Sequence, residues 1–200
     1  IAGNMGVVEP KDEFLQGLRN LATEFETILI FDEVITGFRV AHGGAQERFG
    51  VMPDLTTLGK IIGGGLPVGA YGGRSEIMTH VAPEGSIYQA GTLSGNPISM
   101  AGGIATLTEL NNHDLYDQLD KLGTYFANGL RNIAAEYTLP IIVNQFGSMM
   151  GLFFTNSEIN NFNDVTNSDI ETYNSLHRYL LENNIYFPPS AYETFFLSSA

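Results

Sequence analysis

Several residue types that carry chemistry or charge are scarce in this 200-residue chain. It has no cysteine, which excludes disulfide bonds, thiolate metal sites and a cysteine nucleophile, and fits the cytoplasm or a similar reducing compartment. Only 9 lysines and arginines oppose 22 acidic residues, whereas a nucleic-acid surface needs clustered cations. No apolar run approaches the roughly 20 residues of a membrane span. These absences favour an acidic, folded protein that binds neither nucleic acid nor membranes.

The two ends are unusual for a complete protein. Residue 1 is Ile, and Thr194 to Ser198 has the composition of a strand that stops where a turn should follow. Both features predict that the chain is a piece of a longer protein. A processed, naturally short protein is the alternative.

The first half of the chain predicts a helix followed by short buried strands. Apolar residues recur at helical spacing over 13–25, and short apolar runs then occur between turn signals. The expected strands cover residues 28–31, 55–58 and 68–71. Fully apolar strands that alternate with helices indicate an α/β fold with a parallel or mostly parallel sheet.

The second half predicts long helices and a smaller α+β unit. A helix is expected over 97–110, because Asn96 can cap it and Pro97 suits its first position. The further elements are a helix over 114–137, paired strands over 141–143 and 149–154, a surface loop over 156–168, a helix over 169–182 and a strand over 185–187. The boundary between the two units is expected near residues 111–114.

The first candidate for chemistry is Asp32, which ends the apolar run Ile28–Phe31. Open α/β sheets bind their ligands at the carboxyl ends of strands, and a carboxylate beside apolar residues needs a cation or a strong donor. Val34 lies two residues on and shares its face of the strand. Asp32 could therefore bind a ring nitrogen while Val34 packs on the ring. Equally, Asp32 could simply cap the next turn.

Lys60 is the second candidate. Apolar residues flank it on both sides, and Gly63-Gly64-Gly65 follows. A desolvated lysine has a lowered pKa, as Schiff-base lysines require, although most lysines are simply solvated. The glycines suggest a close approach or left-handed backbone angles. A phosphate loop of the P-loop type is excluded, because the lysine precedes the glycines.

The third candidate is the loop Tyr88–Pro97, rich in glycine and hydroxyl groups. It leads into a predicted helix start, where free backbone N–H groups and a Thr or Ser hydroxyl can bind an anion. A plain capping loop would explain Asn96 and Pro97 as well. Pyridoxal 5′-phosphate needs three contacts that these candidates could supply together: an acid for its ring nitrogen, a lysine for its carbonyl group and a loop for its phosphate.

These motifs resemble those of the class-III, fold-type-I aminotransferases that depend on pyridoxal phosphate. The segments that carry this resemblance are Phe31–Arg39, Pro53–Lys60 and Gly63–Ala70. Within that family, further segments are similar to the glutamate-1-semialdehyde 2,1-aminomutase branch: Ala2–Val8, Gly43–Gln46, Tyr88–Pro97 and Ser190–Glu193. The resemblance covers nearly all of the chain and is strongest as far as Leu110. Residues 111–184 depart freely from the family in residue type.

The resemblance implies a role for each candidate residue. Lys60 would hold the cofactor and shuttle protons as the catalytic residue, while Asp32 would keep the pyridinium nitrogen protonated with Val34 on the ring. The other implied cofactor contacts are Gly91 and Thr92 at the phosphate of a neighbouring subunit, Asn4 on the side of the ring hydroxyl, and Tyr88 near the phosphate. The implied assembly is a homodimer, and no metal is expected.

The implied enzyme is an isomerase that moves an amino group within one five-carbon molecule. It would convert glutamate-1-semialdehyde to 5-aminolevulinate for tetrapyrrole (porphyrin) synthesis, with the cofactor starting and ending as pyridoxamine 5′-phosphate. One alternative is a related ω-aminotransferase that transfers the amino group to a 2-oxo acid. Asn4 argues against it, because ordinary members more often have a Glu-containing Gln-Gly motif there.

The resemblance also sets the expected domains. Residues 1–112 would form part of the large cofactor-binding domain, and residues 113–200 an incomplete small C-terminal domain. Relatives have an additional N-terminal portion with the other phosphate loop and the aromatic residue that stacks on the cofactor. A cofactor-free, inactive piece is therefore a further alternative for the isolated chain. The four histidines, His42, His80, His113 and His177, show no metal-ligand spacing.

Overall fold

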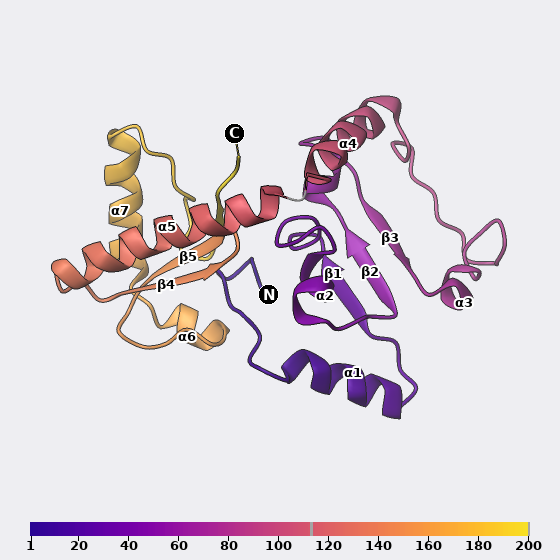
Figure 1. Ribbon diagram of the computed structural model, residues 1–200, viewed down its shortest axis with the longest axis horizontal. Coiled ribbons are helices and arrows are strands. Elements are labelled where there is room, and N and C mark those ends of the chain that lie inside the picture. Colours follow the sequence, from indigo (N-terminus) through magenta and orange to yellow (C-terminus); the bar gives the residue numbers. More distant parts are fainter. Residues whose placement is uncertain (113, 200) are drawn as a thin grey trace. The chain divides into compact units, whose positions relative to one another are not determined.

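The computed structural model describes residues 1–112 and 114–199, and their contacts divide them into two compact units (Figure 1). The described residues of Asp12–His113 form one unit, here called the β1–β3 unit. Ile1–Lys11 joins Asp114–Ala200 in the other, here called the β4–β6 unit. Within the described residues, no helix is both long and apolar enough to span a membrane.

The β1–β3 unit contains a three-stranded sheet and five helical segments. Its elements are α1 (Phe14–Glu24), β1 (Ile30–Glu33), α2 (Gly44–Phe49), β2 (Leu55–Leu58), the 3-10 helix η1 (Lys60–Gly63), β3 (Ala70–Gly73), α3 (Ser75–Met78) and α4 (Pro97–Leu110) (Figure 1). Strand β2 lies in the centre, parallel to β1 and antiparallel to β3. The carboxyl ends of β1 and β2 therefore lie at one edge of the sheet.

The sequence predicts α1, α4 and the three strands, whereas α2, η1 and α3 were not expected. Three details of the strands are wrong. Strand β1 covers Ile30–Glu33 rather than residues 28–31, because its pairing with β2 continues through Asp32 and Glu33. Strand β3 begins at Ala70, two residues later than expected, and its antiparallel pairing makes the described sheet mixed. The run before Asp32 is not buried, since Ile28 and Ile30 are 53% and 55% exposed. In the described chain β1 pairs on one side only, so it is an edge strand rather than a central one.

The glycines after Lys60 let α4 approach closely. Gly64 has a φ of +59°, and a Cβ there would lie 2.3 Å from the Thr106 hydroxyl oxygen and 2.7 Å from the carbonyl oxygen of Gly102. Gly65 has a φ of +87°. The prediction of close approach and left-handed angles is confirmed, because only glycine meets both requirements at Gly64 without strain.

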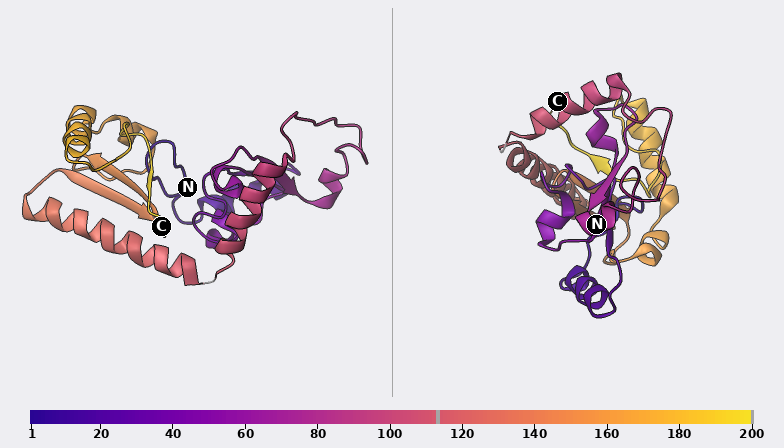
Figure 2. Two further views of the ribbon diagram at one scale, coloured as in Figure 1. Left: turned by 90° about the horizontal axis from the view of Figure 1, so that it is seen from above. Right: turned by 90° about the vertical axis from the view of Figure 1, so that its right-hand side faces the viewer.

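The β4–β6 unit is built around an antiparallel sheet. Its elements are α5 (Asp114–Glu136), β4 (Ile141–Phe146), β5 (Met149–Phe154), α6 (Phe162–Thr166), α7 (Ile170–Glu182) and β6 (Phe195–Phe196). The strand order is β4-β5-β6, and the long helix α5 runs along the sheet (Figures 1 and 2). Buried residues of α5, β4, β5 and α7 form one apolar cluster with Ala191: Ala127, Val143, Met150, Leu152 and Tyr173.

A second apolar cluster of this unit includes the start of the chain. Val8 packs with Phe153 of β5 and with Ile159 and Val165. Two backbone hydrogen bonds join Ala2 and Val8: the Ala2 N–H donates to the carbonyl oxygen of Val8 at 3.0 Å, and the Val8 N–H donates to that of Ala2 at 3.1 Å. The contacts thus group residues 1–11 with the C-terminal residues, whereas the sequence interpretation assigned 1–112 to one domain; that assignment stays a prediction.

Two predictions for this unit are wrong. The loop expected over 156–168 contains α6, because Val165 is fully buried and Asn161 caps the helix by accepting the Asp164 N–H. No strand forms over 185–187, because both sides of β5 are already paired, with β4 and β6. Pro188 follows directly, and proline both lacks an N–H and restricts the preceding residue.

Candidate active site

Three of the candidate residues meet at the carboxyl ends of the parallel strands β1 and β2. Asp32 pairs in register with Thr57, so it lies beside the end of the strand that Lys60 follows. Between them, a Cβ on Gly59 would lie 3.1 Å from a methyl group of Val34. The topology therefore gathers Asp32, Val34 and Lys60 at the edge where α/β sheets bind ligands.

Asp32 is exposed, although the sequence suggested a carboxylate among apolar groups. Its Oδ1 accepts a hydrogen bond of 3.0 Å from the Val34 N–H. The side chain thus caps the turn after β1, as the simpler alternative expected. A carboxylate has acceptor sites to spare, so capping with one oxygen is compatible with binding a ligand through the other.

Lys60 is also exposed, which corrects the expectation of a desolvated lysine. Within η1, Ile62 and Gly63 are buried, whereas Lys60 at its start is exposed. Lys60 has a φ of 49°, and this left-handed conformation costs a non-glycine residue about 1–2 kcal/mol. The strained backbone occurs at the one lysine to which the sequence assigns chemistry.

The loop before α4 is a capped turn in front of a helix start, as predicted. The Asn96 side chain accepts the Ser99 N–H at 3.0 Å and donates to the carbonyl oxygen of Leu93 at 3.0 Å. Gly95 has a φ of +68°, and the Ser94 N–H donates to the carbonyl oxygen of Gly91. These hydrogen bonds hold the loop together in front of α4.

The same loop lines a cavity of about 440 Å³ together with residues 67–69, which follow the glycines after Lys60. Gly91 lies in its wall, whereas Thr92 and Tyr88 are exposed on the loop and do not line it. The structure therefore brings Gly91 close to the segment after Lys60. It shows no contact between Tyr88 and the other candidates.

Asn4 belongs to the β4–β6 unit, where it is exposed in a turn held by distant residues. The Gly6 N–H donates to the carbonyl oxygen of Tyr192 at 2.7 Å, and the Asn144 side chain donates to the carbonyl oxygen of Val7 at 2.8 Å. The turn that carries Asn4 is thus built on the C-terminal part of the chain.

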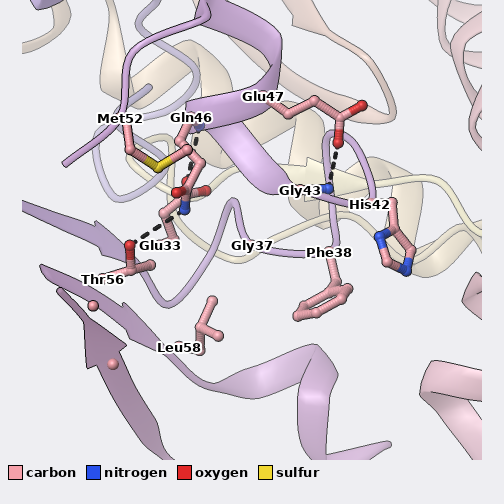
Figure 3. Close-up of a pocket in the computed structure, with 12 residues that line it drawn as sticks. Glu33, Gly37, Phe38, His42, Gly43, Gln46, Glu47, Met52, Thr56 and Leu58 are labelled. Carbon is pink, nitrogen blue, oxygen red and sulfur yellow. Dashed lines mark hydrogen bonds between the residues drawn. The ribbon is translucent and has the colours of Figure 1, made fainter. Parts of the chain in front are cut away.

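Two buried carboxylates went unnoticed in the sequence. Glu33 is 1% exposed and accepts four hydrogen bonds, and it lines a cavity of about 540 Å³ (Figure 3). Asp54 is 4% exposed, and hydrogen bonds from Arg74, the Leu29 N–H and Arg19 hold the pKa of its carboxyl well below the ordinary value. The sequence signal for Glu33 is its place as a second acidic residue directly after Asp32, at the end of an apolar run.

The part of the chain that the structure describes contains no group of three or more histidine and acidic side chains that could hold a metal ion. His42 pairs with Asn111 at 2.9 Å instead. His113 lies outside the described residues.

Comparison with known proteins identifies the class. The family model described as aminotransferase class-III matches residues 1–178, and the chain belongs to this family. Over its whole length it is 54% identical to glutamate-1-semialdehyde 2,1-aminomutase 2 of Brevibacillus brevis and 53% identical to the glutamate-1-semialdehyde 2,1-aminomutase of Thermosipho africanus. It spans 47% of each of these relatives, about half their length.

Solved structures agree with this family. An omega-transaminase from Sphaerobacter thermophilus superimposes with a TM-score of 0.90 at 32% identity, over 97% of this chain and 44% of the other. A glutamate-1-semialdehyde-aminomutase from Pseudomonas aeruginosa, in complex with PMP, gives 0.83 at 27% identity, over 98% and 45%. The expected fold class, part of a fold-type-I transferase, is confirmed.

Proposed function

We propose that this chain forms the later part of a pyridoxal-phosphate-dependent aminomutase that converts glutamate-1-semialdehyde to 5-aminolevulinate. The observation that carries the proposal is the meeting of Asp32, Val34 and Lys60 at the carboxyl ends of β1 and β2. The likeness to aminomutases along the whole chain supports the substrate. The cytoplasm, or a plastid stroma, is the proposed compartment.

The residues present fit this cofactor chemically. A carboxylate, an aliphatic side chain and a primary amine occur together at one sheet edge. The carboxylate suits the pyridinium nitrogen of the cofactor, the aliphatic side chain suits its ring face, and the amine suits its aldehyde. The bound cofactor supplies an electron sink for the carbon atoms that exchange the amino group. Asp32 would stabilise positive charge at the ring nitrogen, and Val34 would orient the ring.

Lys60 would act as the proton carrier. Its amine ends a long, exposed side chain on a strained backbone position, so it can reach ligand atoms beyond the strand ends. Moving an amino group between neighbouring carbon atoms requires a proton to be taken from one carbon and returned to another. One lysine that serves both positions needs no second base. Asn4 would contact the ring hydroxyl.

Borohydride reduction of the full-length enzyme that carries these residues, loaded with pyridoxal 5′-phosphate, the aldehyde form of the cofactor, tests this assignment. Reduction should fix the cofactor on the peptide that contains Lys60, and Lys60→Ala should abolish turnover, whereas the exposed Lys121→Ala of α5 should leave it unchanged. Labelling of another lysine would refute the proposal. Sustained turnover with an external amino donor and a 2-oxo acid would instead favour the ω-aminotransferase.

The proposal includes a homodimer in which Gly91 and Thr92 bind the phosphate of the partner's cofactor. Apolar side chains of this loop and of α4 are exposed: Leu93, Ile98 and Ile104 are each at least 65% exposed. Contiguous exposed apolar surface is typical of an interface between subunits.

Hybrid dimers test the shared site. One subunit would carry Lys60→Ala and the other Thr92→Ala. If Thr92 serves the neighbour, one site of the hybrid has both intact residues, and activity returns to about half of the wild-type value. If Thr92 serves its own subunit, both sites are damaged and no activity returns.

A further inference from the structure

Glu33 is the most completely enclosed charged side chain among the described residues, at 1% exposure. Its Oε2 accepts from the Thr36 hydroxyl at 2.8 Å and from the Ala45 N–H at 2.6 Å. Its Oε1 accepts from the backbone N–H of Gln46 at 2.9 Å and from the side-chain amide of Gln46 at 3.1 Å. Each oxygen therefore faces two donors.

Only a carboxylate satisfies this arrangement. Both oxygens of an ionised carboxyl group are acceptors, whereas an amide of the same shape places an NH₂ group against two donors. A buried donor left without an acceptor is costly. Glutamine is thus a poor substitute for Glu33 although it has nearly the same volume.

The surrounding backbone leaves room for the carboxylate. Gly44 has a φ of +70°, and a Cβ there would lie 2.3 Å from Glu33 Oε2. At Gly37, a Cβ would lie 2.7 Å from the Glu33 carbonyl oxygen. These two glycines explain part of the motif around Asp32: they allow the chain to wrap around the residue that follows it.

Glu33 and Asp32 hold the same turn from opposite sides. On the buried side, Glu33 binds Thr36 through its carboxylate and the Gly37 N–H through its carbonyl oxygen, at 2.8 Å each. On the exposed side, Asp32 Oδ1 accepts the Val34 N–H at 3.0 Å. The rotamer of Asp32 therefore depends on where this turn places Val34.

The contacts of Glu33 also extend to the next strand. The Gln46 side-chain amide donates to Glu33 and, at 3.3 Å, to the Thr56 hydroxyl of β2 (Figure 3). Glu33, the last residue of β1, and Gln46 thus connect β1, α2 and β2 next to Asp32 and two residues before the end of the strand that Lys60 follows.

We infer that Glu33 is a positioning residue: it fixes the turn after β1 and thereby aims Asp32 at the ring nitrogen of the cofactor. This inference rests on the proposed function. Glu33 does not contact the ligand, and it acts through the geometry of Asp32.

The test uses the full-length holoenzyme with a ¹⁵N-labelled cofactor ring. The ¹⁵N chemical shift of the ring nitrogen reports its protonation, which a merely structural role would not change. Glu33→Gln should move this shift toward the value in Asp32→Asn, and should lower kcat about tenfold or more with KM within about twofold. Glu47→Gln is the matched control: the exposed Glu47 carboxylate of α2 accepts the N–H of Gly43, the residue just before that helix, and wild-type values are expected.

Several outcomes would overturn the inference. A lowered melting temperature with a wild-type ¹⁵N shift would make Glu33 structural only. Multiplicative losses of kcat in the Asp32→Asn/Glu33→Gln double variant would show that the two act independently, whereas action through Asp32 predicts no further loss. If Glu33→Gln does not fold, Thr36→Val removes a single donor and should shift the signal in the same direction, while Thr36→Ser restores it. A wild-type signal in Asp32→Asn itself would instead refute the proposed function.

Discussion

The two units of this chain bury different kinds of side chain. In the β4–β6 unit the largest fully buried side chains are Phe153, Met149 and Met150. In the β1–β3 unit the largest is Glu33, and Asp54 is buried as well. One unit is packed around large apolar side chains, whereas the other, besides smaller apolar residues, buries carboxylates that accept several hydrogen bonds.

This difference corresponds to the proposed roles of the units. Apolar packing is non-directional and tolerates small shifts, whereas a carboxylate with several donors fixes the positions of the segments that it joins. Asp32, Val34 and Lys60 belong to the unit with the buried carboxylates. The candidate active-site residues are thus supported by polar contacts, and the two units should respond differently to substitution and to pH.

Removing an apolar side chain from the β4–β6 unit should have the largest effect. Phe153→Ala deletes a ring that is 1% exposed and lies against Gly6, so the free energy of unfolding should fall by about 3–5 kcal/mol. Urea unfolding measures this change. Phe162→Ala is the control, since that ring is 54% exposed, and equal losses for both variants would contradict the apolar-core interpretation.

Asp54 should dominate the acid response of the β1–β3 unit. Asp54→Ala removes acceptors 2.8 Å from Arg19, Arg74 and the Leu29 N–H, and should cost about 2–3 kcal/mol. Because folding lowers the pKa of Asp54, its contribution is complete above the unfolded pKa near 3.8 and is lost as the pH falls through the folded value. Asp54→Asn should therefore flatten the acid limb of stability against pH. An unchanged acid limb would show that other carboxyls govern it.

Tyr173 should govern part of the alkaline response of the β4–β6 unit. Burial, and then the charge of Glu193, raise the pKa of its hydroxyl to about 12. Its contribution is complete below the unfolded value of 10 and is lost as the pH rises through 12. Tyr173→Phe should flatten that limb, and should cost about 1–2 kcal/mol near neutral pH because the Pro188 carbonyl oxygen loses its donor. Thermal unfolding between pH 8 and 12 measures both effects, with Tyr179→Phe on the exposed face of α7 as the control.

The helix caps should give the smallest and most similar effects. Asn96→Ala at α4 and Asp169→Ala at α7 each remove one acceptor for a backbone N–H and should cost about 1 kcal/mol. Asn96 also binds the carbonyl oxygen of Leu93, so its loss should additionally weaken cofactor binding in the holoenzyme, whereas loss of Asp169 should not. Equal cofactor affinities in the two variants would remove this distinction between the units.

The elements that the sequence predicts correctly have local causes. Asn96 followed by Pro97 begins α4 at the expected residue, and Asp169 caps α7. The strand over 55–58 follows a turn signal and matches β2. The missed helix α6 and the false strand over 185–187 have causes elsewhere in the fold: the burial of Val165 by residues from the start of the chain, and the pairing of β5 with β6.

The candidate site likewise has some features with local causes and others that depend on the tertiary structure. Residue types and spacing alone indicate a carboxylate, a lysine and a glycine-rich loop for one cofactor, because the chemistry of each is local. Neither the exposure of Asp32 and Lys60 nor the buried network of Glu33 can be derived locally, since both depend on which segments cover each side chain.

The sequence by itself determined the family, the starts of the capped helices α4 and α7, and the chemical groups, because these depend on short motifs and on capping residues. Only the tertiary structure decided which of two adjacent carboxylates is buried. Asp32 and Glu33 alternate across one strand, and the wrapping of Gly44 to Gln46 around Glu33 leaves Asp32 to the solvent. That choice depends on contacts between segments more than ten residues apart, which no local pattern contains.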